Sequence, residues 1–221
     1  MDASAHTVGM LLADARLPSG GHAQSAGLEP ALLGGLPVEH VPAFLLARAR
    51  TVSLVDAATA VAARHAALDG RSLAAVERAW AARTPSRALR EASRDLGRGL
   101  LRLASQVWPQ VPPLLWGVSG VPARPLVLGA IAAHAQMDAA SLVRVSIYDD
   151  MACAVAALLK LEPGDPAQGV SLVLQACASV EPRVALLGAI TTPDQIPAAT
   201  APHAEAWSED HALTSRRLFR A

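Results

Sequence analysis

The 221-residue chain lacks features that mark several protein classes. Aromatic residues make up only 3 % of it, and its net charge is zero because 19 basic residues balance 19 acidic ones. A protein that binds nucleic acid or anionic membranes through a basic surface needs an excess of positive charge, so the composition argues against both kinds of partner. Apolar residues make up 52 %, enough to offset the chain entropy, so we expect a folded protein.

Cysteine and lysine are also scarce. The chain has only two cysteines, Cys153 and Cys177, and no CxxC motif, which excludes a zinc knuckle or a disulfide framework. We expect both cysteines to be small buried residues of the core. The one lysine, Lys160, follows no glycine-rich turn, so the chain has no phosphate-binding loop. The histidines never pair at the spacing of one helical turn, which excludes a two-histidine metal motif on one helix. We therefore expect a protein that is not an enzyme and has no metal or cofactor of its own.

Neither a membrane span nor a secretory signal is expected. The longest stretch without a charged residue, Leu103–Ala123, contains four prolines, which a spanning helix of about 20 residues does not accommodate. A signal peptide has a basic region followed by an apolar run, whereas the start of this sequence contains Asp2, His6 and Asp14 and lacks that pattern. These features predict a soluble, cytoplasmic protein.

Apolar residues recur at helical spacing along most of the chain, and the alternation typical of strands is hard to find. The sequence predicts one all-α bundle of about 8–10 helices over residues 1–213, followed by an extended tail at 214–221. The stretch 103–123 is the one candidate for a long irregular connection, and because it contains Trp108 and Trp116 we expect it to pack against the bundle. The clearest helices are expected at 40–68, from Pro85 to just before Pro109, and at 125–136, 139–161, 166–178 and about 198–213.

A turn around Pro18 and Gly20 is the first unusual feature. Proline followed by a pair of glycines makes a tight turn, since glycine adopts backbone angles that other residues avoid. We expect His22 and Ser25 on the first turn of the helix that follows, with Glu29 one turn beyond. The turn is either an ordinary corner between helices or part of a partner-binding surface.

Five arginines form the second feature. They are spaced by 3, 4, 4 and 4 residues, so on a helix they cover an arc of about 120° opposite the leucines. Glu91 and Asp95 neutralise part of this charge. The stripe is either a solvated helix face or a docking surface for an acidic partner, because guanidinium groups bind carboxylates through two bonds. Its members are Arg87, Arg90, Arg94, Arg98 and Arg102.

The third feature is the tail, where Leu218 and Phe219 lie among Arg216, Arg217 and Arg220. An apolar pair among arginines predicts a segment that becomes ordered against a partner, with the aromatic ring as its anchor. Docking of the tail on its own chain is the alternative.

In these three places the sequence resembles the UreF family of urease accessory proteins. Residues 12–29 are similar to the family's LxDSxLPxGxFxHSxGLE pattern, residues 90–102 to its basic helix, and residues 217–221 to its RLFRS end. The residues that match these motifs, and are therefore candidates for partner binding, are Pro18, Gly20, His22, Ser25, Gly27, Leu28, Glu29, Arg90, Arg94, Arg98, Arg217, Leu218 and Phe219.

The resemblance implies an all-α, dimeric scaffold without an activity of its own. Members of the family bridge a UreD-type protein (called UreH in some species) and the UreG-type GTPase, which delivers nickel into apo-urease in a GTP-dependent step. The resemblance thus implies that nickel is handled by the complex and is not tightly bound by this chain.

The chain departs from the family pattern at two places. Lys160 stands where the pattern has an arginine, and lysine cannot make the planar two-pronged contact of a guanidinium group. In the N-terminal pattern, His22 occupies the aromatic or apolar position, and Gln24 with Ser25 replaces the His/Ser pair.

Two other functions remain open on the residues alone. One is a helical enzyme with an interior site built from dispersed groups such as His65, His134 and Asp138, which predicts a deep polar pocket with shifted pKa values. A scaffold instead predicts an exposed apolar patch with an arginine rim. The other is a ligand-sensing regulator, which is weakly supported because no helix-turn-helix has a clear basic excess.

Overall fold

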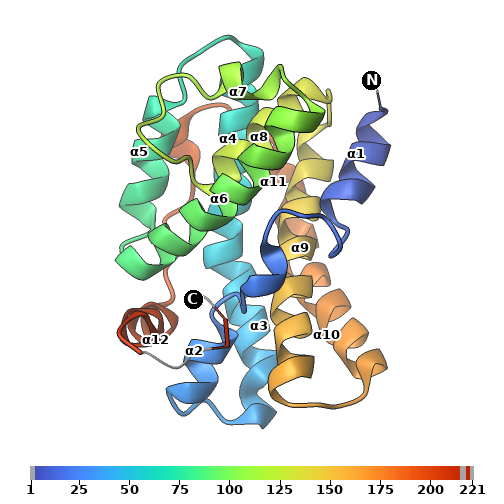
Figure 1. Ribbon diagram of the computed structural model, residues 1–221, viewed down its shortest axis with the longest axis vertical. Coiled ribbons are helices and arrows are strands. Elements are labelled where there is room, and N and C mark those ends of the chain that lie inside the picture. Colours follow the sequence, from blue (N-terminus) through green and yellow to red (C-terminus); the bar gives the residue numbers. More distant parts are fainter. Residues whose placement is uncertain (1–2, 215–217, 220–221) are drawn as a thin grey trace.

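All regular secondary structure in the described residues is helical (Figure 1). The computed structural model describes residues 3–214 and 218–219, and no strand occurs among them, which confirms the predicted all-α fold. The ten helices of six or more residues are α1 (Ala5–Leu12), α2 (Leu28–Leu33), α3 (Val41–Arg50), α4 (Val52–Leu68), α5 (Ala74–Arg83), α6 (Arg87–Val107), α8 (Arg124–His134), α9 (Ala139–Leu161), α10 (Pro166–Ala178) and α12 (Pro202–Ala212). Shorter elements connect them, namely α7 (Val111–Leu114), α11 (Val184–Gly188), η1 (Gly21–Ala23), η2 (Val38–His40), η3 (Glu181–Arg183) and η4 (Pro193–Gln195).

Helix α4 lies at the centre of the bundle and packs against α8 and α9. Its small residues are buried on nearly every face, so neighbouring helices can surround it. At Gly129 of α8, a Cβ atom would lie 2.4 Å from the carbonyl oxygen of Ala60. The missing side chain therefore lets the backbones of α4 and α8 come into contact.

Side-chain caps define where the long helices begin. The Ser86 hydroxyl accepts a hydrogen bond from the Leu89 N–H at the start of α6, and the Asp138 carboxylate accepts one from Ser141 at the start of α9. Asp165 caps α10 in the same way. Helices α9 and α10 begin and end at the residues that the apolar spacing predicts, which confirms both predictions.

The structure differs from the sequence predictions in local detail. The helix predicted at 40–68 breaks at Thr51, whose φ and ψ of −124° and −92° separate α3 from α4. His22 lies in the 3₁₀ turn η1, and Ser25 lies before α2, so neither is on an α-helical turn. The stretch 103–123 packs against the bundle as predicted, through the buried Trp108 and Val111. It is not irregular throughout, since residues 103–107 belong to α6, and its Trp116 is 55 % exposed.

Replacing Gly129 by alanine tests the close contact between α4 and α8. We expect Gly129→Ala to lower the free energy of unfolding by about 2 kcal/mol or more, because the added methyl group meets a backbone oxygen that cannot move aside. Urea unfolding followed by circular dichroism measures this change. Gly164→Ala is the control, since a Cβ there has only an ordinary contact at 3.9 Å. Equal stability losses in the two variants would contradict the proposed constraint.

Candidate functional site

The segment 18–29, called here the N-terminal motif, is held between α6 and α9. A Cβ atom at Gly99 of α6 would lie 2.1 Å from the Ser19 carbonyl oxygen, so only glycine lets α6 approach the turn this closely. On the other side, the Cys153 thiol of α9 lies 3.5 Å from the Gly21 carbonyl oxygen and 3.3 Å from that of Gln24, and donates to both. The motif is therefore fixed to two long helices through its backbone.

One half of the motif is exposed and the other half is buried. Pro18 and His22 face solvent, whereas the residues from Ser25 to Glu29 are buried in the chain. The Ser25 hydroxyl accepts a hydrogen bond of 3.2 Å from the Glu29 N–H, and Gly27 adopts a φ of +77°, which favours glycine. The buried half, which includes Leu28, therefore forms the base of the turn and presents the exposed half.

The described residues of the tail dock against the end of the motif. The Glu29 carboxylate accepts hydrogen bonds from the backbone N–H groups of Leu218, at 2.7 Å, and Phe219, at 2.8 Å. The Phe219 ring is buried, and the Lys160 ammonium nitrogen lies 5.2 Å from its centroid and 3.5 Å from the His22 carbonyl oxygen. Lys160 thus contacts both the motif and the tail.

The arginines of α6 are largely engaged within the chain. Arg90 donates to the carbonyl oxygens of Thr84 and Pro85, at 2.7 Å each, and the Arg94 guanidinium lies 5.7 Å from the centroid of the Trp80 ring. Arg98 forms an ion pair with a neighbouring carboxylate and stays exposed, as does Arg87. Arg217, the remaining predicted arginine, lies outside the described residues.

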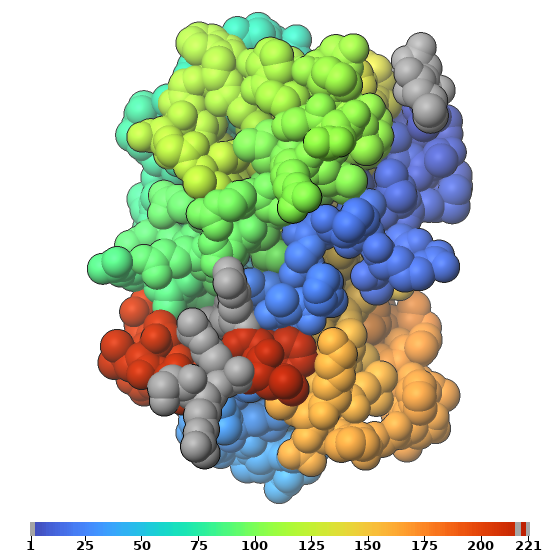
Figure 2. Space-filling view, viewed as in Figure 1, coloured from blue at the N-terminus to red at the C-terminus, as the bar shows by residue number. Residues whose placement is uncertain are grey.

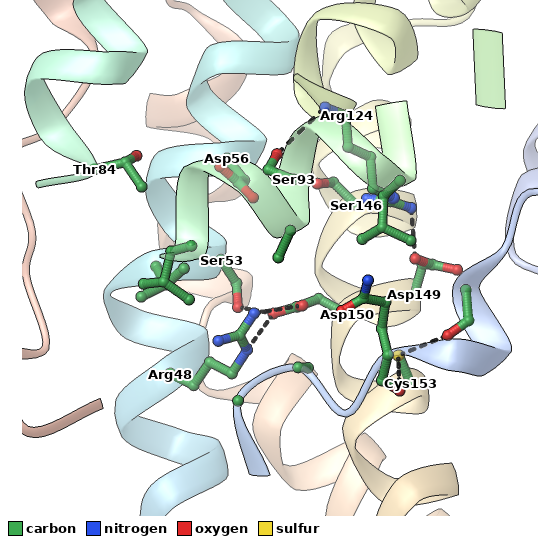
Figure 3. Close-up of a pocket in the computed structure, with 18 of the residues that line it drawn as sticks. Arg48, Ser53, Asp56, Thr84, Ser93, Arg124, Ser146, Asp149, Asp150 and Cys153 are labelled. Carbon is green, nitrogen blue, oxygen red and sulfur yellow. Dashed lines mark hydrogen bonds and ion pairs between the residues drawn. The ribbon is translucent and has the colours of Figure 1, made fainter. Parts of the chain in front are cut away.

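A polar cavity of about 80 Å³ lies beneath the motif, between α4, α6 and α9 (Figure 3). The Arg48 guanidinium forms two hydrogen bonds with the Asp150 carboxylate, at 2.8 and 2.9 Å, and the Ser53 hydroxyl donates to the same carboxylate. At the other side of the cavity, Arg124 forms an ion pair with Asp149. The cavity is thus lined by two ion pairs, one between α3 and α9, which are distant in sequence, and one between the consecutive helices α8 and α9.

Burial shifts the acidity of the groups around the cavity. Burial and the nearby Asp150 charge raise the pKa of Asp56 to about 6, although the Trp80 ring N–H donates to it at 3.0 Å. Burial alone would raise the pKa of Asp150, but Arg48 and Ser53 bring it below its usual value. Burial also raises the pKa of the Cys153 thiol to about 12, so this cysteine is not a nucleophile near neutral pH.

Sequence reasoning missed this cavity, although two signals point to it. Asp149 and Asp150 are adjacent in the otherwise apolar middle of α9, and Asp56 interrupts the small-residue run of α4. A carboxylate on a helix that is buried on most of its faces needs a cation or donor partner. Such a carboxylate is therefore a sign of a buried polar site.

The residues of the enzyme hypothesis do not line this cavity. His65 lies 3.4 Å from Asp69, Asp138 caps α9, and His134 ends α8. The polar pocket with shifted pKa values that the hypothesis predicts does exist, but other residues build it. In the part of the chain that the structure describes, no three His, Cys, Asp or Glu side chains come together as metal ligands.

Replacing Asp56 by asparagine tests the buried charge. Because the pKa of Asp56 in the folded chain, about 6, exceeds that of an unfolded aspartate, folding favours the protonated form and stability falls as the pH rises from about 4 to 7. Asp56→Asn keeps the acceptor for Trp80 and removes the charge. We expect its stability relative to the parent chain to rise by about 2 kcal/mol across this pH range, measured by urea unfolding.

Asp210→Asn is the control for this experiment, since Asp210 is exposed on α12 and its substitution removes no buried charge. A stability difference between Asp56→Asn and the parent chain that stays constant from pH 4 to pH 7 would contradict the buried charge.

Comparison with known proteins identifies the family of the chain. The UreF family model matches residues 38–177. A urease accessory protein UreF from Mycobacterium sp. (strain JLS) is 42 % identical over 164 residues, which cover 72 % of this chain and 75 % of the relative. Proteins of the same name from Mycolicibacterium vanbaalenii (40 % over 164 residues, 72 % and 75 %) and Mycobacterium marinum (36 % over 190 residues, 81 % and 86 %) also match. The length of the family match and these identities place the chain in the UreF family of urease accessory proteins.

Proposed function

We propose that the chain is a non-catalytic scaffold of urease maturation. In this proposal it bridges a UreD/UreH-type protein and a UreG-type GTPase, so that GTP-dependent nickel insertion into apo-urease takes place on the assembled complex in the cytoplasm. Nickel is then cargo of the complex and not a cofactor of this chain. The relatives named as urease accessory proteins support this role.

The observation that carries the proposal is the convergence of three surface segments. The N-terminal motif, α6 and the tail are far apart in sequence, yet they lie on one face of the molecule, where Figure 2 colours them blue, green and red. The exposed residues of these three segments include Pro18, His22, Arg98 and Leu218. A continuous surface with apolar and guanidinium groups is the kind of surface that a protein partner recognises.

The state of the polar cavity also favours a scaffold over an enzyme. Its two arginines are paired with Asp149 and Asp150, so the charges neutralise one another and join the helices together. The Cys153 thiol stays protonated at neutral pH and donates to the motif backbone. These groups therefore stabilise the base of the motif, and partner recognition needs no reacting group among them.

A second exposed surface supports self-association. The stretch Pro166–Gly188 is apolar and long enough to cross a membrane, but it consists of two helices interrupted by the 3₁₀ turn η3. Leu174 is 62 % exposed and lines a shallow pocket with Tyr148 of α9, and Val170, one helical turn earlier, is 60 % exposed. We assign this apolar face to contact with a second copy of the chain, because a two-fold axis places the same patch on both subunits.

The ion pair between Arg144 and Glu181 lies next to this face and leaves it without an excess of either charge. Two copies therefore meet there without repulsion between like charges, which favours a homodimer over a strongly charged partner.

Removal of residues 216–221 tests the bridging role. We expect the shortened chain to lose co-purification with a co-expressed UreD/UreH-type protein, because the tail surface is gone, while its helicity by circular dichroism stays unchanged. The full chain with Glu39→Gln, a change at an exposed carboxylate of η2, is the matched control. Unchanged co-purification of the shortened chain would count against the tail as a binding element.

Leu174→Arg tests the dimer surface. The substitution places a charge in the apolar face, so we expect the molar mass in solution, measured by light scattering after size-exclusion chromatography, to fall from that of a dimer to that of a monomer. Leu33→Arg is the control, since Leu33 is equally exposed but lies on α2. A dimer that persists in Leu174→Arg would show that another surface joins the subunits.

A further inference from the structure

Leu218 and Phe219 are neighbours in the tail, but their side chains lie in opposite environments. The Phe219 side chain is 4 % exposed and packs into the chain, whereas Leu218 is 64 % exposed. Phe219 therefore anchors the tail, whereas Leu218 presents an apolar side chain to solvent. A leucine this exposed beside a buried aromatic ring is held in place by something other than its own packing.

The Glu29 carboxylate is what holds it. This carboxylate is nearly inaccessible to solvent, and it accepts the two consecutive N–H groups of the tail together with a bond of 3.1 Å from Nε2 of His211. Two of these three donors belong to the backbone, so the contact fixes the path of the tail whatever side chain stands at position 218. A buried carboxylate gains its stability from such donors, because burial without them costs several kcal/mol.

His211 is a third hydrogen-bond donor to the Glu29 carboxylate. Because a carboxylate only accepts hydrogen bonds, His211 donates from Nε2, and its Nδ1 atom is buried without a hydrogen-bond partner among the described residues. Nothing else in that part of the chain fixes the ring by a hydrogen bond. Glu29 therefore organises both the end of α12 and the tail that follows it.

We propose that Glu29 is a positioning residue for the tail, and that the positioned tail binds its protein partner through the Leu218 side chain and not through Phe219. The inference rests on the proposed scaffold function and assigns its contact residue. Three of the last six residues in the sequence are arginines. The surface that fits this segment is therefore an apolar pocket surrounded by acidic side chains on the partner protein.

Three variants separate positioning from contact. Glu29→Gln keeps the size of the side chain but replaces one acceptor oxygen by an NH₂ donor, which opposes at least one of the three N–H groups. Phe219→Ala removes the packed ring. Leu218→Ala leaves both backbone bonds in place and removes only the exposed side chain. Leu33→Ala is the matched control, because Leu33 is 65 % exposed and lies outside the tail.

Two measurements are made on each full-length variant after circular dichroism has shown normal helicity. Amide hydrogen exchange of residues 218 and 219, followed by NMR, reports whether the tail is docked, and needs no partner. Affinity for the purified UreD/UreH-type protein, measured by titration calorimetry, reports contact. We expect Glu29→Gln and Phe219→Ala to exchange at least about tenfold faster and to bind at least about tenfold more weakly.

For Leu218→Ala we expect protected amides and a similar loss of affinity, and for Leu33→Ala no change in either measurement. Protected amides in Glu29→Gln would overturn the positioning role, and full affinity of Leu218→Ala would overturn the contact role. A parent chain that does not bind the UreD/UreH-type protein would overturn the proposed bridging function and the role of Leu218 with it, while the exchange data would still decide whether Glu29 positions the tail.

Discussion

The ion pair between Arg48 and Asp150 supports the whole functional face. It joins α3 to α9, and the Ser53 hydroxyl adds α4 to the same carboxylate. The base of the N-terminal motif rests on this pair, since a Cβ at Gly27 would lie 3.4 Å from the Arg48 guanidinium. The pair is largely shielded from solvent, so the loss of one partner leaves a charge without compensation, which costs about 3–5 kcal/mol where burial is complete and less at this partly buried pair. The position of the motif, and of the tail docked on Glu29, therefore depends on three helices that the pair holds together.

The sequence is most informative where one helix face decides the structure. The apolar spacing predicts α9 and α10 to the residue, because these helices bury a regular stripe, and in the structure Asp138 and Asp165 cap their first turns. It is less informative where tertiary contacts override local pattern. Thr51 breaks a continuous apolar periodicity, and the turn after Gly20 forms a 3₁₀ element because its carbonyl groups bond to Cys153 of α9.

In the candidate site, too, local sequence patterns can be predicted and tertiary contacts cannot. The resemblance to the family finds the motif, the arginine helix and the tail, but not that Glu29 receives the tail, since a contact across about 190 residues leaves no mark in local spacing. Helical geometry alone also does not show that Arg90 and Arg94 contact the chain itself. Arg90 bonds to Thr84, which precedes the arginine stripe, and Arg94 lies over Trp80, which is on another helix. A motif match thus locates a surface, but it does not show which residues stabilise that surface from within and which are exposed to a partner.

The large separation between Glu29 and Leu218 also sets an order of events during synthesis. The carboxylate leaves the ribosome early, and its backbone partners follow 189 residues later, after every helix of the bundle. A polypeptide interrupted before residue 218 can still bury its central helices, yet it carries an unfilled acceptor where the tail belongs. Docking of the tail on Glu29 therefore needs residues that are synthesised after all of these helices, and a partner that binds this region distinguishes chains that contain Leu218 and Phe219 from shorter ones.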